Sequence, residues 1–143
     1  MHWAHNGYTV DTDPAKVDPD VVYDFLRTSY WASHRSREQI AASWQNATVQ
    51  FGLYDSGGVM VGGCRVLSDS VTYAWLGDVF VVPTHRGQGL GKFLVACVVE
   101  HGALKHVEQF HLATQDAHGL YEQFGWRPLP AAMPDKLMVK LPP

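Results

Sequence analysis

The feature that most constrains this chain is a glycine-rich turn between a hydrophobic strand and a helix. The strand ends at Val79–Val82, and the sequence Arg86-Gly87-Gln88-Gly89-Leu90-Gly91-Lys92 follows it. Three glycines within five residues let the backbone approach a ligand closely. The free N–H groups at the start of the helix converge on the same place, and the helix dipole favours negative charge there. The turn therefore predicts a binding site for a phosphate or pyrophosphate group.

The spacing of the glycines excludes two common phosphate-binding motifs. A P-loop requires G-x-x-x-x-G-K-[ST], whereas Phe93 follows Lys92 in this chain. The dinucleotide fingerprint requires G-x-G-x-x-G, whereas Gly87, Gly89 and Gly91 are each two residues apart. Taken alone, the turn leaves open a loop that only changes the direction of the chain.

Hydrophobic periodicity divides the chain into segments of helix and strand. A first helix is expected to begin at Asp18, with Pro19 at its first position, and to end near Trp31. A second begins at Ser36, which forms a capping-box pattern with Gln39. The other expected elements are strands at Tyr8–Asp11, Thr48–Tyr54, Val59–Leu67 and Val71–Val82, a helix at Gly89–His101, a strand at Val107–Ala113, a helix at Ala117–Phe124, and strands at Trp126–Leu129 and Leu137–Leu141. The predicted order is βααβββαβαββ, an α/β fold of the α+β kind with a mixed sheet, in one domain over residues 1–143.

Charge and hydropathy exclude several classes of protein. A net charge of -3 provides no basic surface for nucleic acid. No apolar run approaches the roughly 20 residues that span a bilayer, and no signal peptide is expected at the N-terminus. Cys64 and Cys97 have neither C-x-x-C nor metal spacing, and the histidines show no ligand spacing. We expect a cytoplasmic protein with two reduced thiols, no metal site, no nucleic-acid partner and no membrane contact.

Two separated motifs resemble the GNAT superfamily of acetyl-CoA-dependent N-acetyltransferases. The residues Arg86–Gly91 match its [QR]-x-x-G-x-[GA] signature, and Asp78–Pro83 is similar to the strand that precedes this loop. Downstream, Ala117–Trp126 is similar to the family segment A-x-x-L-Y-x-x-x-G-[FW], offset by one residue within its first half. The resemblance implies a mostly antiparallel sheet whose central strands splay apart at the cofactor site.

The resemblance also implies that acetyl-CoA is the acetyl donor. Its pyrophosphate would be held by the backbone amides of the loop, that is, by Arg86, Gly87, Gln88, Gly89, Leu90, Gly91 and Lys92. The strand end, Phe80, Val81 and Val82, would line the pantetheine arm and pair with it, with backbone groups of Val81 left free. Thr114 stands where many family members carry a cofactor-binding asparagine, so the ligand on this strand is open among Thr114, Gln115 and Asp116.

Two residues are candidates for the catalytic chemistry. Tyr121 matches the family tyrosine, whose implied role is general acid toward the leaving CoA thiolate; aromatic packing is the alternative. Asp78 is the candidate general base for the acceptor amine, because a carboxylate among apolar residues is expected to have a raised pKa. The alternatives for Asp78 are a charge on a solvated strand face or a contact to a cationic acceptor.

The acceptor site is expected to involve the first half of the chain. In this family the segment between the first two helices commonly covers the acceptor side, and here it contains Tyr30, Trp31 and Arg35. The aromatic pair could form a wall, and Arg35 could hold an acidic group of the substrate. Trp75 on the long strand could face the same cleft. The alternative for Tyr30 and Trp31 is packing in the core.

The sequence thus predicts an N-acetyltransferase that acts on a primary amine of a small molecule or peptide, by direct attack in a ternary complex. A non-catalytic acyl-CoA-binding regulatory domain is the alternative function. Family members are often dimers, so a homodimer also remains open, although no residue marks an interface.

Overall fold

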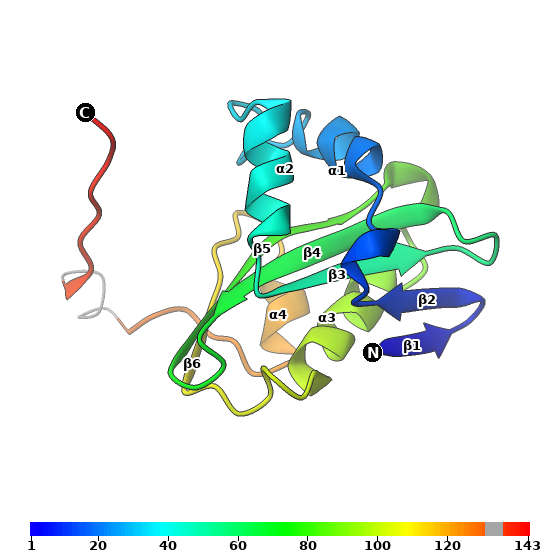
Figure 1. Cartoon of the computed structure of the whole chain (residues 1–143). Coiled ribbons are helices and arrows are strands. Elements are labelled where there is room, and N and C mark those ends of the chain that lie inside the picture. The colour runs from blue at the N-terminus through cyan, green and yellow to red at the C-terminus, as the bar shows by residue number, and fades with distance from the viewer. Residues whose placement is uncertain (131–135) are drawn as a thin grey trace.

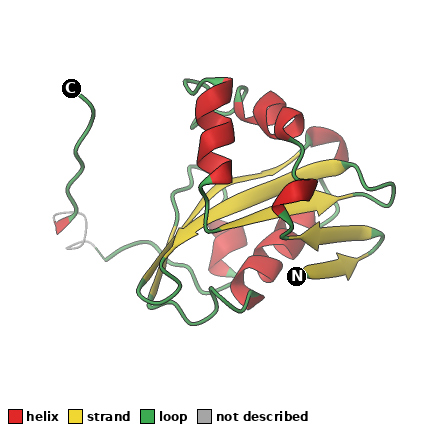
Figure 2. Cartoon of the chain, viewed as in Figure 1, coloured by secondary structure: helices red, strands yellow, loops and turns green. Residues whose placement is uncertain are grey.

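Six strands form one sheet that carries helices on both faces (Figures 1 and 2). The computed structural model describes residues 1–130 and 136–143. The strands are β1 (His2–His5), β2 (Tyr8–Asp11), β3 (Val49–Tyr54), β4 (Met60–Ser68), β5 (Tyr73–Val81) and β6 (Gln109–His111). The helices are α1 (Pro19–Leu26), α2 (Arg37–Gln45), α3 (Leu90–Glu100) and α4 (His118–Glu122), with short 3-10 turns η1 (Pro14–Lys16) and η2 (Pro83–His85). Within the described residues, no helix is long and apolar enough to cross a membrane.

The strands follow one another across the sheet in chain order, from β1 to β6. Neighbouring strands are antiparallel, except that β5 and β6 are parallel. The β5–β6 pairing is short, because it joins only Tyr73–Trp75 to Gln109–His111. Beyond Trp75, β5 continues to Val81 without β6 beside it. This separation is the splay that the family resemblance predicts.

Two hydrophobic cores lie on opposite faces of the sheet. One face is covered by α1 and α2, whose buried residues include Leu26, Ile40 and Trp44. The other face is covered by α3 and α4, and there Leu94 and Tyr121 belong to the larger core. The central strands β3, β4 and β5 contribute side chains to both cores, so functional groups on these strands can be presented on either face.

The predicted helix starts are confirmed. The carboxylate of Asp18 accepts hydrogen bonds from the first turn of α1, and Ser36 and Gln39 form the reciprocal capping box of α2. However, α1 ends at Leu26 rather than near Trp31. The hydroxyl of Ser29 donates to the Leu26 carbonyl and accepts from the Ala32 N–H, which provides the backbone with a non-helical alternative. Residues 27–36 are therefore a loop.

The sheet begins with a hairpin that the sequence analysis missed. Only Tyr8–Asp11 was expected to be a strand, yet β1 pairs with β2 along its whole length, from His2 to His5. Asn6 and Gly7 form the turn, with φ values of 50° and 80°. An Asn-Gly dipeptide is the usual signal of a two-residue hairpin turn, so the sequence did contain the information.

The prediction of two strands at the C-terminus, Trp126–Leu129 and Leu137–Leu141, is wrong, since neither segment is a strand. The indole N–H of Trp126 donates to the Phe110 carbonyl at 2.7 Å, so a side chain binds this carbonyl of β6. Pro128 and Pro130 also lack the N–H that a strand ladder needs. The observed order is ββααβββαβα for the described residues.

A β-bulge in β5 turns Asp78 toward α1 and α2. The register between β4 and β5 shifts between Gly63 and Arg65, and Asp78 has a φ of 55°, which is uncommon for a residue other than glycine. In a regular strand Asp78 would share a face with Leu76, which packs in the core on the α3 side. The bulge reverses this alternation and brings the carboxylate beneath the α1–α2 layer.

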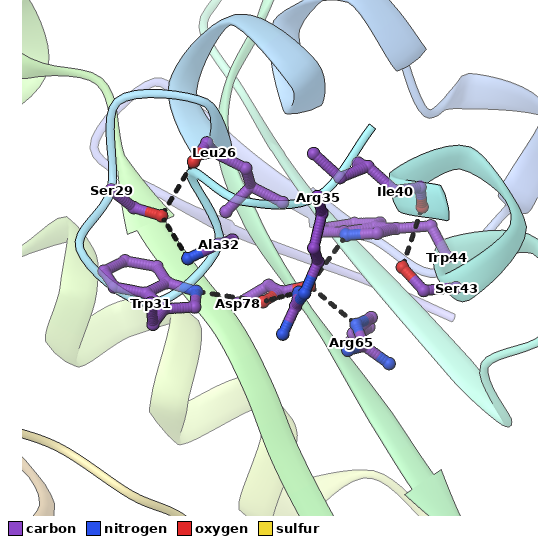
Figure 3. A network of polar contacts seen from close by, with 10 residues as sticks. All are labelled: Leu26, Ser29, Trp31, Ala32, Arg35, Ile40, Ser43, Trp44, Arg65 and Asp78. Atoms are coloured by element: carbon purple, nitrogen blue, oxygen red, sulfur yellow. Dashed lines mark hydrogen bonds and ion pairs between the residues drawn. The ribbon is translucent and has the colours of Figure 1, made fainter. Parts of the chain in front are cut away.

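Four side chains donate hydrogen bonds to the Asp78 carboxylate, whose side chain is 2% exposed (Figure 3). Oδ1 accepts from the indole of Trp31 at 3.0 Å and from Nη1 of Arg35 at 3.1 Å. Oδ2 accepts from Nε of Arg65 at 2.7 Å and from the indole of Trp44 at 3.2 Å. The donors come from the 27–36 loop, from α2 and from β4. One carboxylate therefore connects the α1–α2 layer to the sheet.

The Asp78 network predicts a pH-dependent loss of stability in the variant Asp78→Asn. The folded-state pKa of Asp78 lies below the ordinary value of 3.8, so its carboxylate stabilises the fold fully at neutral pH. That contribution is lost as the pH falls through the folded pKa. We expect Asp78→Asn to lower the free energy of unfolding by about 3–5 kcal/mol at pH 7, and the difference from the wild type to shrink only as the pH falls below 3.8, toward about pH 2. Urea denaturation across this range measures both values.

The matched control for this experiment is Asp24→Asn. Asp24 is 64% exposed and lies 3.9 Å from Arg27, so its loss is expected to cost about 0–1 kcal/mol. A difference between wild type and Asp78→Asn that stays constant from pH 7 down to about pH 2 would contradict the assignment of a stabilising, ionised Asp78.

Candidate active site

A cavity of about 530 Å³ opens where β5 and β6 separate. One wall is the part of β5 that has no β6 partner, the opposite wall is the chain between β6 and α4, and the 27–36 loop closes a third side. The residues that line it are Tyr30, Trp31, Arg35, Arg65, Trp75, Leu76, Gly77, Asp78, Val79, Leu112, Ala113, Thr114, Gln115, Asp116, Ala117 and Tyr121. The cavity thus receives side chains from positions that are distant in sequence.

The acceptor-side residues that the sequence predicts lie together in this cavity. Its lining includes Tyr30, Trp31, Arg35 and Trp75, and Tyr121 lines the same cavity. The Tyr30 ring packs edge-on against Trp31, with centroids 5.1 Å apart. The Tyr30 hydroxyl also accepts a hydrogen bond from the Gln115 N–H at 3.1 Å. This contact joins the 27–36 loop to the segment that follows β6.

The prediction of a raised pKa for Asp78 is wrong, because the pKa of this carboxyl is lowered. Burial alone would raise the pKa of this carboxyl, but the hydrogen bond and charge of Arg65, the charge of Arg35 and the hydrogen bond of Trp31 outweigh burial and lower it. Nor does Asp78 lie on a solvated strand face. Both of its oxygens already accept hydrogen bonds, and a proton on either would weaken them. The arrangement suits a permanent anion that holds its neighbours in place.

Tyr121 is positioned as a proton-bearing group at the cavity wall. It is 8% exposed, and its ring packs edge-on against Trp126 with centroids 5.9 Å apart. Burial raises the pKa of the Tyr121 phenol well above its usual value, and the neighbouring Cys64 and Tyr30 add to the effect. The phenol therefore stays protonated and can donate a hydrogen bond to a developing anion over the whole ordinary pH range.

Thr114 lies in the cavity wall, where its hydroxyl has a local structural role. Its Oγ1 accepts from the Ala117 N–H at 3.0 Å, just before α4 begins. Gln115 and Asp116, the other candidates for this position, also line the cavity. The hydroxyl hydrogen of Thr114 can still be donated to a ligand, because the bond to Ala117 uses only the oxygen as an acceptor.

The glycine-rich turn connects β5 to α3 as predicted. Gly87 and Gly89 have φ values of 81° and 74°, in the left-handed region that favours glycine. Gly89 is the N-cap of α3, and no side chain caps this helix. The N–H groups of its first turn have no side-chain acceptor in the described part of the chain, so the N-terminus of α3 can bind an external anion. Lys92 is exposed on the same first turn.

Other predicted loop residues make contacts within the protein. Arg86 donates through Nε to the Val81 carbonyl at 3.0 Å, so the expectation that the backbone groups of Val81 are free is wrong for this carbonyl. Gln88 accepts from the Tyr8 hydroxyl at 3.4 Å. Leu90 is buried in the α3-side core, so only its backbone can contribute to binding.

The strand end before the loop presents backbone rather than side chains to the splay. Phe80 is buried on the α1–α2 side, where it stacks on Phe25 with ring centroids 4.7 Å apart. Val82 donates to the carbonyl of Val61 on β4 at 2.8 Å, and the register pairs Val81 with Gly62. Val81 therefore occupies a non-hydrogen-bonded position, with its N–H and C=O directed away from β4.

Sequence reasoning missed Arg65, whose side chain is 11% exposed and lines the cavity. It is the charged residue in an otherwise apolar and glycine-rich strand, MVGGCRVLS. A charge in such a strand requires a buried partner, and this was the available signal. Sequence reasoning also missed the bond between Tyr8 and Nδ1 of His85, 2.9 Å long, which ties β2 to the glycine-rich turn. Among the described residues, no three potential metal ligands of the His, Cys, Asp and Glu types lie together.

Comparisons with known proteins point to one family. The profile of the acetyltransferase (GNAT) family matches residues 19–126. A candidate acetyltransferase from Gibberella zeae is 28% identical, over 85% of this chain and 79% of the relative. The crystal structure of a candidate GNAT acetyltransferase from Xanthomonas campestris pv. campestris is 35% identical, with a TM-score of 0.88 over 98% of this chain and 96% of that one. A Deinococcus radiodurans R1 structure at 20% identity, with a TM-score of 0.72 over 98% and 93% of the two chains, shares the fold. The chain therefore belongs to the GNAT family of acetyltransferases, and it is an acyltransferase.

Proposed function

We propose that this protein transfers an acetyl group from acetyl-CoA to a primary amine of a small molecule or peptide. The observation that carries the proposal is the continuity of β5. One end of this strand leads into the uncapped N-terminus of α3, and its middle forms a wall of the cavity that contains Tyr121. This continuity supports the proposal, because the donor's pyrophosphate and its thioester would then lie along one strand.

The donor would lie along the splay between β5 and β6. The N–H groups of the first turn of α3 and of the Arg86–Gly89 turn would bind its pyrophosphate. The outward-facing N–H of Val81 would pair with its pantetheine arm. When bound, acetyl-CoA supplies a thioester whose acetyl group is open to attack by an amine.

Tyr121 would stabilise the leaving thiolate by donating a hydrogen bond to its sulfur. The high pKa of the phenol makes complete proton transfer in the reacting step unfavourable, whereas hydrogen-bond donation needs no transfer. Asp78 would act as a positioning residue, because its oxygens hold Trp31 and Arg35 at the cavity wall. The acceptor amine would then lose its proton through water in the open cavity rather than to Asp78.

The first prediction of this proposal concerns binding. Acetyl-CoA at about 100 times its dissociation constant should stabilise the fold by about 2.7 kcal/mol, which raises the thermal midpoint by roughly 5–10 °C. In Gly89→Ala the shift should be much smaller, because a side chain is strained at the φ of 74° and the turn must change. Differential scanning fluorimetry measures the shift.

Gly102→Ala is the matched control for Gly89→Ala. Gly102 has no heavy atom within 4 Å of an added Cβ and no positive φ, so its variant should keep the full shift. Absence of any shift in the wild-type protein at saturating acetyl-CoA would sink the proposal.

The second prediction concerns catalysis. Thiol release from acetyl-CoA is measured over a panel of amines, and the best acceptor is used for kinetics. Tyr121→Phe should lower kcat about 100-fold with little change in KM for acetyl-CoA. Wild-type kcat should not fall through ionisation of Tyr121 as the pH rises from 7 to 10, since burial raises the pKa of this phenol.

Tyr54→Phe is the control for the loss of a buried hydroxyl. The Tyr54 hydroxyl is buried and has no hydrogen-bond partner among the described residues, and Tyr54 does not line the cavity. Its variant should keep wild-type kcat. If acetyl-CoA binds but no amine raises thiol release above background, the alternative of a non-catalytic acyl-CoA-binding domain gains support.

A further inference from the structure

Two hydrogen-bond donors of the cavity wall converge beside the backbone of Gly77. A Cβ built on Gly77 would lie 3.3 Å from the indole Nε1 of Trp75 and 3.8 Å from Nη2 of Arg65. Gly77 is paired with Arg65 in the register of β4 and β5, and all three residues line the cavity. Because Gly77 has no side chain, the indole of Trp75 lies close to its backbone, and the N–H groups of Trp75 and Arg65 can reach the same ligand at the cavity wall.

Hydrogen bonds among the described residues leave N–H groups of both donors available to a ligand. Within the described part of the chain, Arg65 donates to Asp78 through Nε, and Arg35 does so through Nη1. The Nη atoms of Arg65 point away from Asp78 (Figure 3). The indole N–H of Trp75 has no acceptor among the described residues. Asp78 thus orients one edge of the Arg65 guanidinium and leaves the other edge for a ligand.

The charges at this wall favour a monoanion. Arg35 and Arg65 carry two positive charges, and the buried Asp78 carboxylate balances one of them. The Arg65 side chain is only 11% exposed. A guanidinium that is partly removed from water in this way gains from an anionic partner. A carboxylate matches this charge and accepts hydrogen bonds from Arg65 and Trp75 at the same time. A phosphate dianion would exceed it.

The other wall of the cavity suits an amine. Asp116 is exposed there, in the segment between β6 and α4, and Tyr121 on α4 lines the same cavity. An acceptor with its carboxylate above Gly77 would therefore direct its amine toward the wall where the acetyl group would be delivered.

We propose that the acceptor is a small amino acid-type molecule whose carboxylate is bound above Gly77 by Arg65 and Trp75, with Arg35 beside them. This inference rests on the proposed function and names the substrate class of the same site. It assigns Gly77 as a specificity-determining residue, because a side chain there would meet the Trp75 indole nitrogen at 3.3 Å and displace this donor.

The experiment compares sets of three acceptors that share a side chain: an amino acid, its amide and the corresponding decarboxylated amine. Thiol release from acetyl-CoA gives KM and kcat for each, and thermal midpoints in the presence of CoA report binding without turnover. We expect kcat/KM to be at least 10-fold higher for the amino acid than for its amide and amine, because one charge-assisted hydrogen bond is worth about that factor or more. Aminoalkyl phosphates test whether a dianion binds instead.

Gly77→Ala should raise KM for the amino acid by about 10-fold or more, with a smaller change of KM for the amide and little change for acetyl-CoA. Gly77 has no positive φ, so alanine is compatible with its backbone. Trp75→Phe keeps an aromatic ring but removes the N–H, and should raise KM for the amino acid in the same way. Gly102→Ala, whose added methyl meets open space, is the control.

Two results would overturn this inference and leave the proposed function intact. One is turnover of amides and amines at least as efficient as turnover of amino acids. The other is a preference for aminoalkyl phosphates. If no acceptor is turned over, the binding experiment decides: no change of midpoint with any amino carboxylate refutes the inference, whereas a change that Gly77→Ala abolishes supports it.

Discussion

The buried carboxylate of Asp78 is the group on which the arrangement of the site depends. It accepts hydrogen bonds from Trp31, Trp44, Arg35 and Arg65, which belong to the 27–36 loop, to α2 and to β4. A buried charge is costly unless it is paired and fully hydrogen-bonded. The bulge that turns Asp78 inward and the donors around it are therefore stable only together. Closure of the loop over the cavity and the orientation of both guanidinium groups follow from one interaction.

Much of the local structure could be predicted because it depends on neighbours in sequence. Asp18 and Ser36 start α1 and α2 through bonds to residues two or three positions away. Gly87 and Gly89 shape the turn before α3 through their own φ values, which need no distant contact. The same holds for the hairpin turn at Asn6, which was overlooked although its signal is local. The family resemblance supplied the splay of β5 from β6, which periodicity does not encode.

The parts that were not predicted depend on contacts between distant segments. The pKa of Asp78 was expected to rise because its sequence neighbours are apolar, but a bulge gave it partners that lie 13 to 47 residues away. Two terminal strands were expected from alternation alone, whereas the Trp126 indole binds the β6 carbonyl of Phe110. Arg65 acquired its importance only through the register that places it beside Gly77. No window of sequence contains these pairings.

The role of Asp78 constrains the chemistry of the whole site. An ionised carboxylate that holds two arginines cannot also accept the proton of the proposed amine acceptor without releasing them, because protonation would remove the charge that pairs with Arg35 and Arg65. Deprotonation and recognition must therefore involve different groups. Water in the open cavity can take the proton, while the outer edge of the Arg65 guanidinium remains directed at the space above Gly77. If the acceptor is an amino acid-type molecule, as we propose, a change at Asp78 is expected to alter selectivity and stability together.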